Sequence, residues 1–140
     1  MLYCLCYISK KSDRLTAEGV NEMIRKSSVY NDANSITGVL IEYKTDFLQY
    51  LEGDAVEIYN LFNKIKMDKR HFDVSLLQYS PVEGRIFSEW AMIHKDLNRL
   101  SSTNMDAQIE CAGTIEEILS QKAFWKGLEA IEMMSNLIEA

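Results

Sequence analysis

Three polar side chains, one phenol and two amides, are of the right types and in suitable positions to bind a ligand through hydrogen bonds. Tyr7 lies in an apolar run at the N-terminus, Asn31 opens a run of turn formers before residues 36–38, and Gln49 lies in a second apolar segment. Amides and phenols both donate and accept hydrogen bonds. If adjacent elements of a small sheet bring the three together, they would suit a ligand whose edge alternates donors and acceptors.

The position of Gln49 indicates that its amide is buried and has a hydrogen-bond partner. Successive side chains of a strand point to opposite faces, so Phe47, Gln49 and Leu51 share one face. An unpaired amide in such apolar surroundings costs about 1–3 kcal/mol. Neither Gln49 nor Tyr7 identifies a function by itself, because a single buried Gln or Tyr more often bonds only to its own protein.

The elements that position these residues are predicted to form one α+β domain. Strands are predicted at residues 2–9, 36–43, 47–52, 74–80 and 85–93. One helix begins at Thr16 and ends before Asn31, and a second begins at Gly53-Asp54 and ends at residues 68–71. The order β-α-β-β-α-β-β predicts a ferredoxin-like sandwich, with two helices on one face of a five-stranded mixed sheet.

The last forty residues predict a C-terminal helical extension, residues 96–140, after a domain of residues 1–95. Thr114-Ile115-Glu116-Glu117 has the form of a capping box. An amphipathic helix is then indicated by the apolar residues Phe124, Leu128, Ile131, Met134 and Ile138. A segment of this length does not easily build a hydrophobic core of its own. We therefore expect the extension to pack on the open sheet face or on a partner chain.

Charge and composition exclude several classes of protein. Of the net charge of −6, residues 101–140 contribute most, with 2 Lys and Arg against 7 Asp and Glu. This acidic tail disfavours nucleic acid as a partner, and suits a basic protein or a solvated surface. No apolar run is long enough to cross a membrane, and no secretion signal is recognisable, so we expect a cytoplasmic protein.

The cysteines predict neither disulfides nor a metal site. Cys4, Cys6 and Cys111 are odd in number, which fits a reducing compartment. His71 and His94 are the only histidines that could complete a metal site. Buried, inert thiols are the favoured interpretation.

A series of short motifs runs through about residues 3–94. They are Tyr7-Ile8-Ser9, Asn31 with Ile36-Thr37-Gly38, Phe47-Leu48-Gln49 with Leu51-Glu52-Gly53, Asp68 with Arg70-His71, and then Arg85, Phe87, Trp90 and Met92. In these motifs and their order the chain resembles the BLUF family of blue-light sensors that use FAD. The flavin ring has an edge that alternates donors and acceptors. Position 30, next to Asn31, holds Tyr30, where relatives often carry Asn or His.

The resemblance implies that FAD binds without a covalent bond between the two helices. It assigns Asn31 to the flavin's carbonyl edge, and places Met23 or Ile24 and Ile65 against the ring. The remaining implied contacts are Lys26 and Arg70 at the ribityl-phosphate end, His71 beside them, and Asp68 at the end of the second helix.

The resemblance also implies the light reaction. Tyr7 would give an electron and then a proton towards the excited flavin, and Gln49 would relay the proton and change its hydrogen bonds. Trp90 and Met92 would carry the change to the far side of the sheet, although both also suit core packing.

The expected function is therefore that of a blue-light photoreceptor and not of an enzyme. We expect it to act on a downstream signalling protein, or through a change in a homo-oligomer. A flavin-dependent redox enzyme is one alternative, although the chain has no Gly-rich phosphate loop. A flavin-free ferredoxin-like interaction module is the other.

Overall fold

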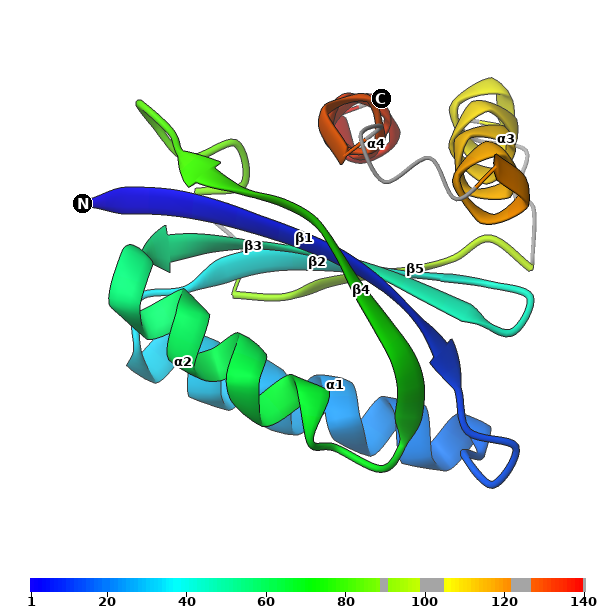
Figure 1. Cartoon of the computed structure of the whole chain (residues 1–140), viewed down its shortest axis with the longest axis horizontal. Coiled ribbons are helices and arrows are strands. Elements are labelled where there is room, and N and C mark those ends of the chain that lie inside the picture. The colour runs from blue at the N-terminus through cyan, green and yellow to red at the C-terminus, as the bar shows by residue number, and fades with distance from the viewer. Residues whose placement is uncertain (89–90, 99–104, 122–126, 140) are drawn as a thin grey trace.

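The computed structural model describes residues 1–88, 91–98, 105–121 and 127–139. Within these ranges, nine elements follow one another (Figure 1). They are β1 (Leu2–Lys11), α1 (Ala17–Ala33), β2 (Thr37–Tyr43), β3 (Asp46–Asp54), α2 (Ala55–Lys66), β4 (His71–Pro81), β5 (Ile93–Asp96), α3 (Met105–Gln121) and α4 (Gly127–Glu139). The predicted α+β class and the order of its strands and first two helices are confirmed.

The sheet has five strands in the order β4-β1-β3-β2-β5. The β1–β3, β1–β4 and β2–β3 pairs are antiparallel, and β5 pairs with β2 in parallel. Figure 1 shows α1 and α2 on one face of the sheet, and α3 and α4 on the other. We call these the α1–α2 face and the α3–α4 face. The central strand β3 therefore has a covered layer on each side.

Local capping residues position the two helices of the first layer. The Thr16 side chain accepts a hydrogen bond from the Gly19 N–H at 3.0 Å, and Asp54 does the same for Val56 at 3.2 Å. Both predicted helix starts are confirmed. The predicted end of α1 is wrong, because the helix continues through Asn31 to Ala33. Asn34 closes it, with its backbone N–H and its Nδ2 both donating to the Tyr30 carbonyl.

The predicted fifth strand is placed too early in the chain. Residues 85–93 were expected to form it, whereas β5 begins at Ile93. The backbone N–H groups of Ile86 and Phe87 instead donate to the two carboxylate oxygens of Glu52, at 2.5 and 3.1 Å. Because a side chain of β3 satisfies these donors, this segment needs no strand partner.

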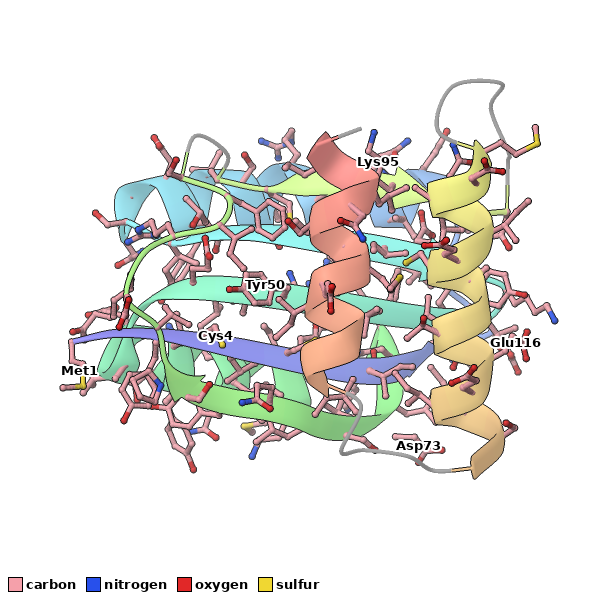
Figure 2. All side chains as sticks on the ribbon, turned by 90° about the horizontal axis from the view of Figure 1, so that it is seen from above. Met1, Cys4, Tyr50, Asp73, Lys95 and Glu116 are labelled. Atoms are coloured by element: carbon pink, nitrogen blue, oxygen red, sulfur yellow. The ribbon has the colours of Figure 1, made fainter. Side chains whose placement is uncertain are left out.

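The C-terminal residues form two helices that pack on the α3–α4 face (Figure 2). The predicted helix start at Thr114 is wrong: Thr114 lies inside α3, and its hydroxyl donates to the Glu110 carbonyl at 3.1 Å. Phe124, and the side chains of Leu128 and Ile138, lie outside the described part of the chain. The cluster that joins the helices to the sheet includes Cys4, Cys6, Leu48, Tyr50, Cys111, Ile115, Ile118, Ile131, Met134 and Leu137.

The three cysteines are free and buried in this cluster. Burial raises the pKa of the Cys6 thiol well above its usual range, and that of Cys111 to about 12. The Cys6 and Cys111 thiols are therefore protonated and unreactive at neutral pH. In the described ranges, no three His, Cys, Asp or Glu side chains are grouped so that they could hold a metal ion. None of the described helices could span a membrane.

Candidate functional site

A cavity of about 240 Å³ lies on the α1–α2 face, between the two helices and the sheet. Its walls come from α1, α2, β1, β2, β3 and the start of β4, together with the segment before β5. Every predicted site residue that the structure describes contributes to the lining; Trp90 lies outside the described residues. These are Tyr7, Met23, Ile24, Lys26, Asn31, Gln49, Ile65, Asp68, Arg70, His71 and Met92.

Tyr7 and Gln49 form a buried hydrogen-bonded pair at the base of the cavity. The register of β1 and β3 places them directly opposite each other. The Tyr7 hydroxyl donates to Gln49 Oε1, and the two residues are 3% and 6% exposed. Burial raises the pKa of Tyr7 far above its usual range, with smaller contributions from Cys6 and Asp68. The phenol therefore keeps its proton at physiological pH and acts as the donor.

The nitrogen of the Gln49 amide has a much weaker partner than its oxygen. Gln49 Nε2 donates to the Met92 sulfur at 3.8 Å. A thioether is a poor acceptor, so this bond gives little resistance to a rotation of the amide. Gln49 thus combines a firm contact to the phenol with a loose contact to the segment that leads into β5.

The side-chain oxygen of Asn31, Oδ1, is buried and receives no hydrogen bond from the described residues. The Nδ2 of the same side chain donates to the Ala91 carbonyl at 2.9 Å, which fixes the orientation of the amide. Leaving the Oδ1 oxygen unpaired costs about 1–3 kcal/mol. A ligand that offers an N–H group to Asn31 would remove this cost.

Apolar side chains on both helices face the cavity. Met23 and Ile24 lie on α1, and Leu61 and Ile65 lie on α2. Leu61 is one helical turn before Ile65, and this spacing could have identified it from the sequence. The opposed apolar surfaces suit a flat ring whose polar edge points to Asn31 and Gln49.

Charged groups surround the α2 end of the cavity. Arg70 Nε donates to Asp68 Oδ1 and Oδ2 at 2.9 and 3.0 Å, and the Asp68 carboxylate also accepts from the Arg70 backbone N–H at 3.0 Å. The hydrogen bond from Arg70 lowers the pKa of Asp68 below its usual range, despite partial burial. The Asp68 N–H donates to the Ile65 carbonyl at 3.1 Å, so this residue does lie at the end of α2.

His71 uses both ring nitrogens within the protein. Its Nε2 is 2.6 Å from the Ile65 carbonyl, and its Nδ1 is 2.8 Å from Ser9 Oγ. Because a carbonyl can only accept, Nε2 carries the hydrogen, and a neutral ring then accepts the Ser9 hydroxyl at Nδ1. His71 therefore ties β1 to the end of α2, and leaves only its ring surface to the cavity.

Several lining residues were not expected from the sequence. Leu40 and Phe47 come from β2 and β3, and Ser27 and Lys64 come from the two helices. Tyr30, which the sequence analysis noted as a departure from relatives, also lines the cavity. The Lys64 ammonium on α2 lies 5.1 Å from the centre of the Tyr30 ring on α1. Such contacts between helices depend on how the helices pack, and a single sequence carries no local signal for them.

Residues 2–93 match the family model described as BLUF, sensors of blue light using FAD. The chain belongs to the BLUF family. Domains of this family use FAD, and the cavity fits that cofactor, because the unpaired Asn31 oxygen and the apolar helix faces suit an imide edge and a flat ring. The BLUF match covers all of the site residues described above.

Proteins similar to this BLUF chain include both enzymes and short proteins. It is 33% identical over 92 residues to the photoactivated adenylate cyclase subunit beta of Euglena gracilis, an alignment of 65% of this chain and 11% of that protein. The chain thus spans about a tenth of the length of this curated relative. The photo-activated state of BlsA matches with a TM-score of 0.70 and 26% identity, over 79% of this chain and 78% of BlsA. The dark state of BlrB, a BLUF protein, matches in fold with a TM-score of 0.77 at 23% identity, over 98% and 94% of the two chains.

Proposed function

We propose that this BLUF sensor detects blue light through a hydrogen-bond switch between Tyr7 and Gln49. The observation that carries the proposal is the buried bond between these two residues, beside a cavity with an unpaired acceptor on Asn31. The proposal assigns binding to Asn31 and the apolar side chains, and the light reaction to the phenol and the glutamine.

Asn31 holds the polar edge of FAD by accepting from the ring N–H at its free Oδ1. Met23 and Ile24 on one side, and Ile65 on the other, pack against the faces of the ring. The bond from Asn31 Nδ2 to the Ala91 carbonyl orients the amide before the cofactor binds. Arg70 and Lys26 both line the cavity, where their positive charges suit the polar chain of the cofactor.

Bound FAD, excited by blue light, supplies an oxidant strong enough to remove an electron from a phenol. Tyr7 is the donor, because its hydroxyl is buried and contacts a cavity residue. A phenol that has lost an electron becomes a strong acid, so its proton moves along the existing bond to Gln49 Oε1, and Gln49 would release a proton from Nε2 towards the cofactor in exchange. Return of the electron and a proton to Tyr7 would restore the phenol and leave the hydrogen bonds of Gln49 changed. The Gln49 amide can then change its partners at low cost, because the weak Met92 thioether is the acceptor for Gln49 Nε2 among the described residues.

The segment before β5 carries the change out of the site. Ala91 bonds to Asn31 and Met92 bonds to Gln49, and β5 begins at the next residue, Ile93. We propose that this movement changes a contact with a downstream signalling protein, or the assembly of a homo-oligomer, and that the BLUF domain itself catalyses no reaction. Light scattering in the dark and under blue light measures a change of assembly.

Absorption spectra of dark-purified protein, before and after a blue pulse, test the light reaction. Wild-type protein is expected to shift its flavin bands to longer wavelength and to recover in the dark. Tyr7→Phe is expected to bind FAD without any shift, because it lacks the oxidisable hydroxyl. Tyr59→Phe, at a site 46% exposed on α2, is the matched control and is expected to shift normally. Bleaching of the wild-type flavin, or a normal shift in Tyr7→Phe, contradicts the proposal.

A further inference from the structure

Part of the chain between β4 and β5 contacts both faces of the sheet. We call its described residues, 85–88 and 91–92, the crossing segment. Phe87 is buried in the cluster of the α3–α4 face. Met92 instead packs against the two clusters of the α1–α2 face and lines the cavity there. The crossing segment therefore links the two layers of the molecule.

At its α3–α4 end, the crossing segment is held by the carboxylate of Glu52 on β3. Ile86 and Phe87 each donate their backbone N–H to one oxygen of this buried group. The hydroxyls of Tyr50 and Thr37 donate to the same two oxygens, both at 2.9 Å, so each oxygen accepts two hydrogen bonds. Hydrogen bonds to a carboxylate are about twice as strong as those between neutral groups. This end of the crossing segment is therefore firmly fixed to β3.

At its cavity end, the crossing segment has weaker contacts. The Ala91 carbonyl accepts one bond between neutral groups, from Asn31 Nδ2 at 2.9 Å. The Met92 sulfur accepts from Gln49 Nε2 at 3.8 Å, and a thioether is a poor acceptor. The position of Met92 beside Gln49 therefore depends on the firmer support that Glu52 gives to the other end.

Tyr50 helps to hold the Glu52 carboxylate in place. Its hydroxyl donates to Glu52 Oε1, and its ring lies edge-on to the Phe87 ring, with 5.5 Å between the ring centres. Burial, with a smaller contribution from Glu52, raises the pKa of Tyr50 far above its usual range, so the hydroxyl keeps its hydrogen. Tyr50 lies on the α3–α4 side of the sheet (Figure 2), and its neighbour Gln49 lines the cavity on the other side.

We propose that Glu52 and Tyr50 are positioning residues for the light reaction, which hold Met92 where it accepts from Gln49 and so set the rate of recovery in the dark. This inference rests on the proposed function, because it requires Gln49 to change its hydrogen bonds in the light. The return of Gln49 to the arrangement described above restores its bond to Met92, so this return needs Met92 in place. A crossing segment that has lost part of its support spends less time in this position, and recovery is slower.

The test removes one of the four donors to Glu52. Tyr50→Phe keeps the buried ring and lacks only the hydroxyl. After a blue pulse, its flavin bands are expected to shift as far as in wild type, because Tyr7 and Gln49 are intact. Dark recovery is expected to be at least about threefold slower, which is the effect of losing one modest hydrogen bond. Amide hydrogen exchange at Ile86 and Phe87, measured by NMR on protein kept in the dark, is expected to be faster by a similar factor.

Tyr79→Phe is the matched control. The Tyr79 hydroxyl donates to the Ala55 carbonyl at 3.0 Å, so this variant also loses one hydrogen bond, but none to Glu52 or the crossing segment. Its recovery and its exchange at residues 86 and 87 are expected to equal those of wild type. Wild-type recovery in Tyr50→Phe overturns the inference, as does an equal slowing in Tyr79→Phe.

A second variant and the exchange measurement keep the inference separate from folding and from the proposed function. Should Tyr50→Phe fail to fold, Glu52→Asp takes its place with the same expectations, because it keeps the carboxylate on a side chain shorter by one carbon. Unchanged exchange at residues 86 and 87 overturns the positioning role whatever the light reaction does. Wild-type protein that shows no red shift contradicts the proposed function, and exchange in the dark still decides whether Glu52 and Tyr50 position the crossing segment.

Discussion

Replacing Glu52 with alanine is expected to destabilise the protein by about 3–5 kcal/mol. Glu52 is fully buried, and its carboxylate accepts four hydrogen bonds. Two come from the hydroxyls of Thr37 and Tyr50, both at 2.9 Å, and two come from the N–H groups of Ile86 and Phe87. The alanine variant leaves all four donors without this acceptor.

The magnitude follows from which donors can find another partner. The hydroxyls can rotate, so most of the cost comes from the two backbone N–H groups, at about 1–3 kcal/mol each. The cavity left by the side chain adds to this cost. The variant is also expected to release residues 86 and 87 from the sheet, because these two bonds hold their backbone to β3.

Urea unfolding, followed by circular dichroism, measures the free energy of unfolding. Glu83→Ala, at an exposed position near the same segment, is the control and is expected to change stability by less than about 0.5 kcal/mol. Glu52→Gln, which keeps one acceptor oxygen, is expected to fall between the two. A loss below about 1 kcal/mol in Glu52→Ala would refute the assignment of the carboxylate as the main support of this segment.

Two further predictions concern Asn31 and Glu42. Asn31→Ala is expected to weaken FAD binding about tenfold, because the variant lacks the acceptor oxygen Oδ1. Fluorescence titration measures the affinity. An unchanged affinity would show that Oδ1 does not contact the cofactor. Burial favours a raised pKa at Glu42, but hydrogen bonds from His94 and Lys11 outweigh it and hold the pKa below its usual value. Glu42 therefore stabilises the fold above the ordinary pKa of about 4.3, and this contribution is lost as the pH falls through the folded-state pKa. The stability difference between wild type and Glu42→Gln, measured by urea unfolding at several pH values, is expected to shrink in acid, and a constant difference would contradict this sign.

Features with a local cause were predictable from the sequence. Thr16 and Asp54 cap their helices through bonds to residues two or three positions away. The alternation of side chains along a strand correctly placed Gln49 on the face opposite Tyr50. The resemblance to the BLUF motifs then identified residues that line the cavity. Side-chain alternation and residue spacing alone would not have predicted that Asn31 and Tyr7 line the same cavity.

Features with a distant cause were missed. The segment after β4 bonds to Glu52, more than thirty residues earlier, so its own β-like pattern was misleading. Asn31 was expected in a turn, but the amide of Asn34 extends the helix past it. Arg14 and Lys69 lie on two separate loops but line one cavity, and nothing in either local sequence indicates this meeting.

The central strand β3 is shared by both layers of the molecule. Gln49 lies in the cavity, while its neighbours Leu48 and Tyr50 lie in the cluster with α3 and α4. Any molecule that binds the α3–α4 layer and distinguishes between two arrangements of Gln49 must therefore alter the equilibrium between them. Under the proposed light reaction, thermodynamic reciprocity means that a partner which prefers the illuminated arrangement of Gln49 would also stabilise that arrangement relative to the dark one.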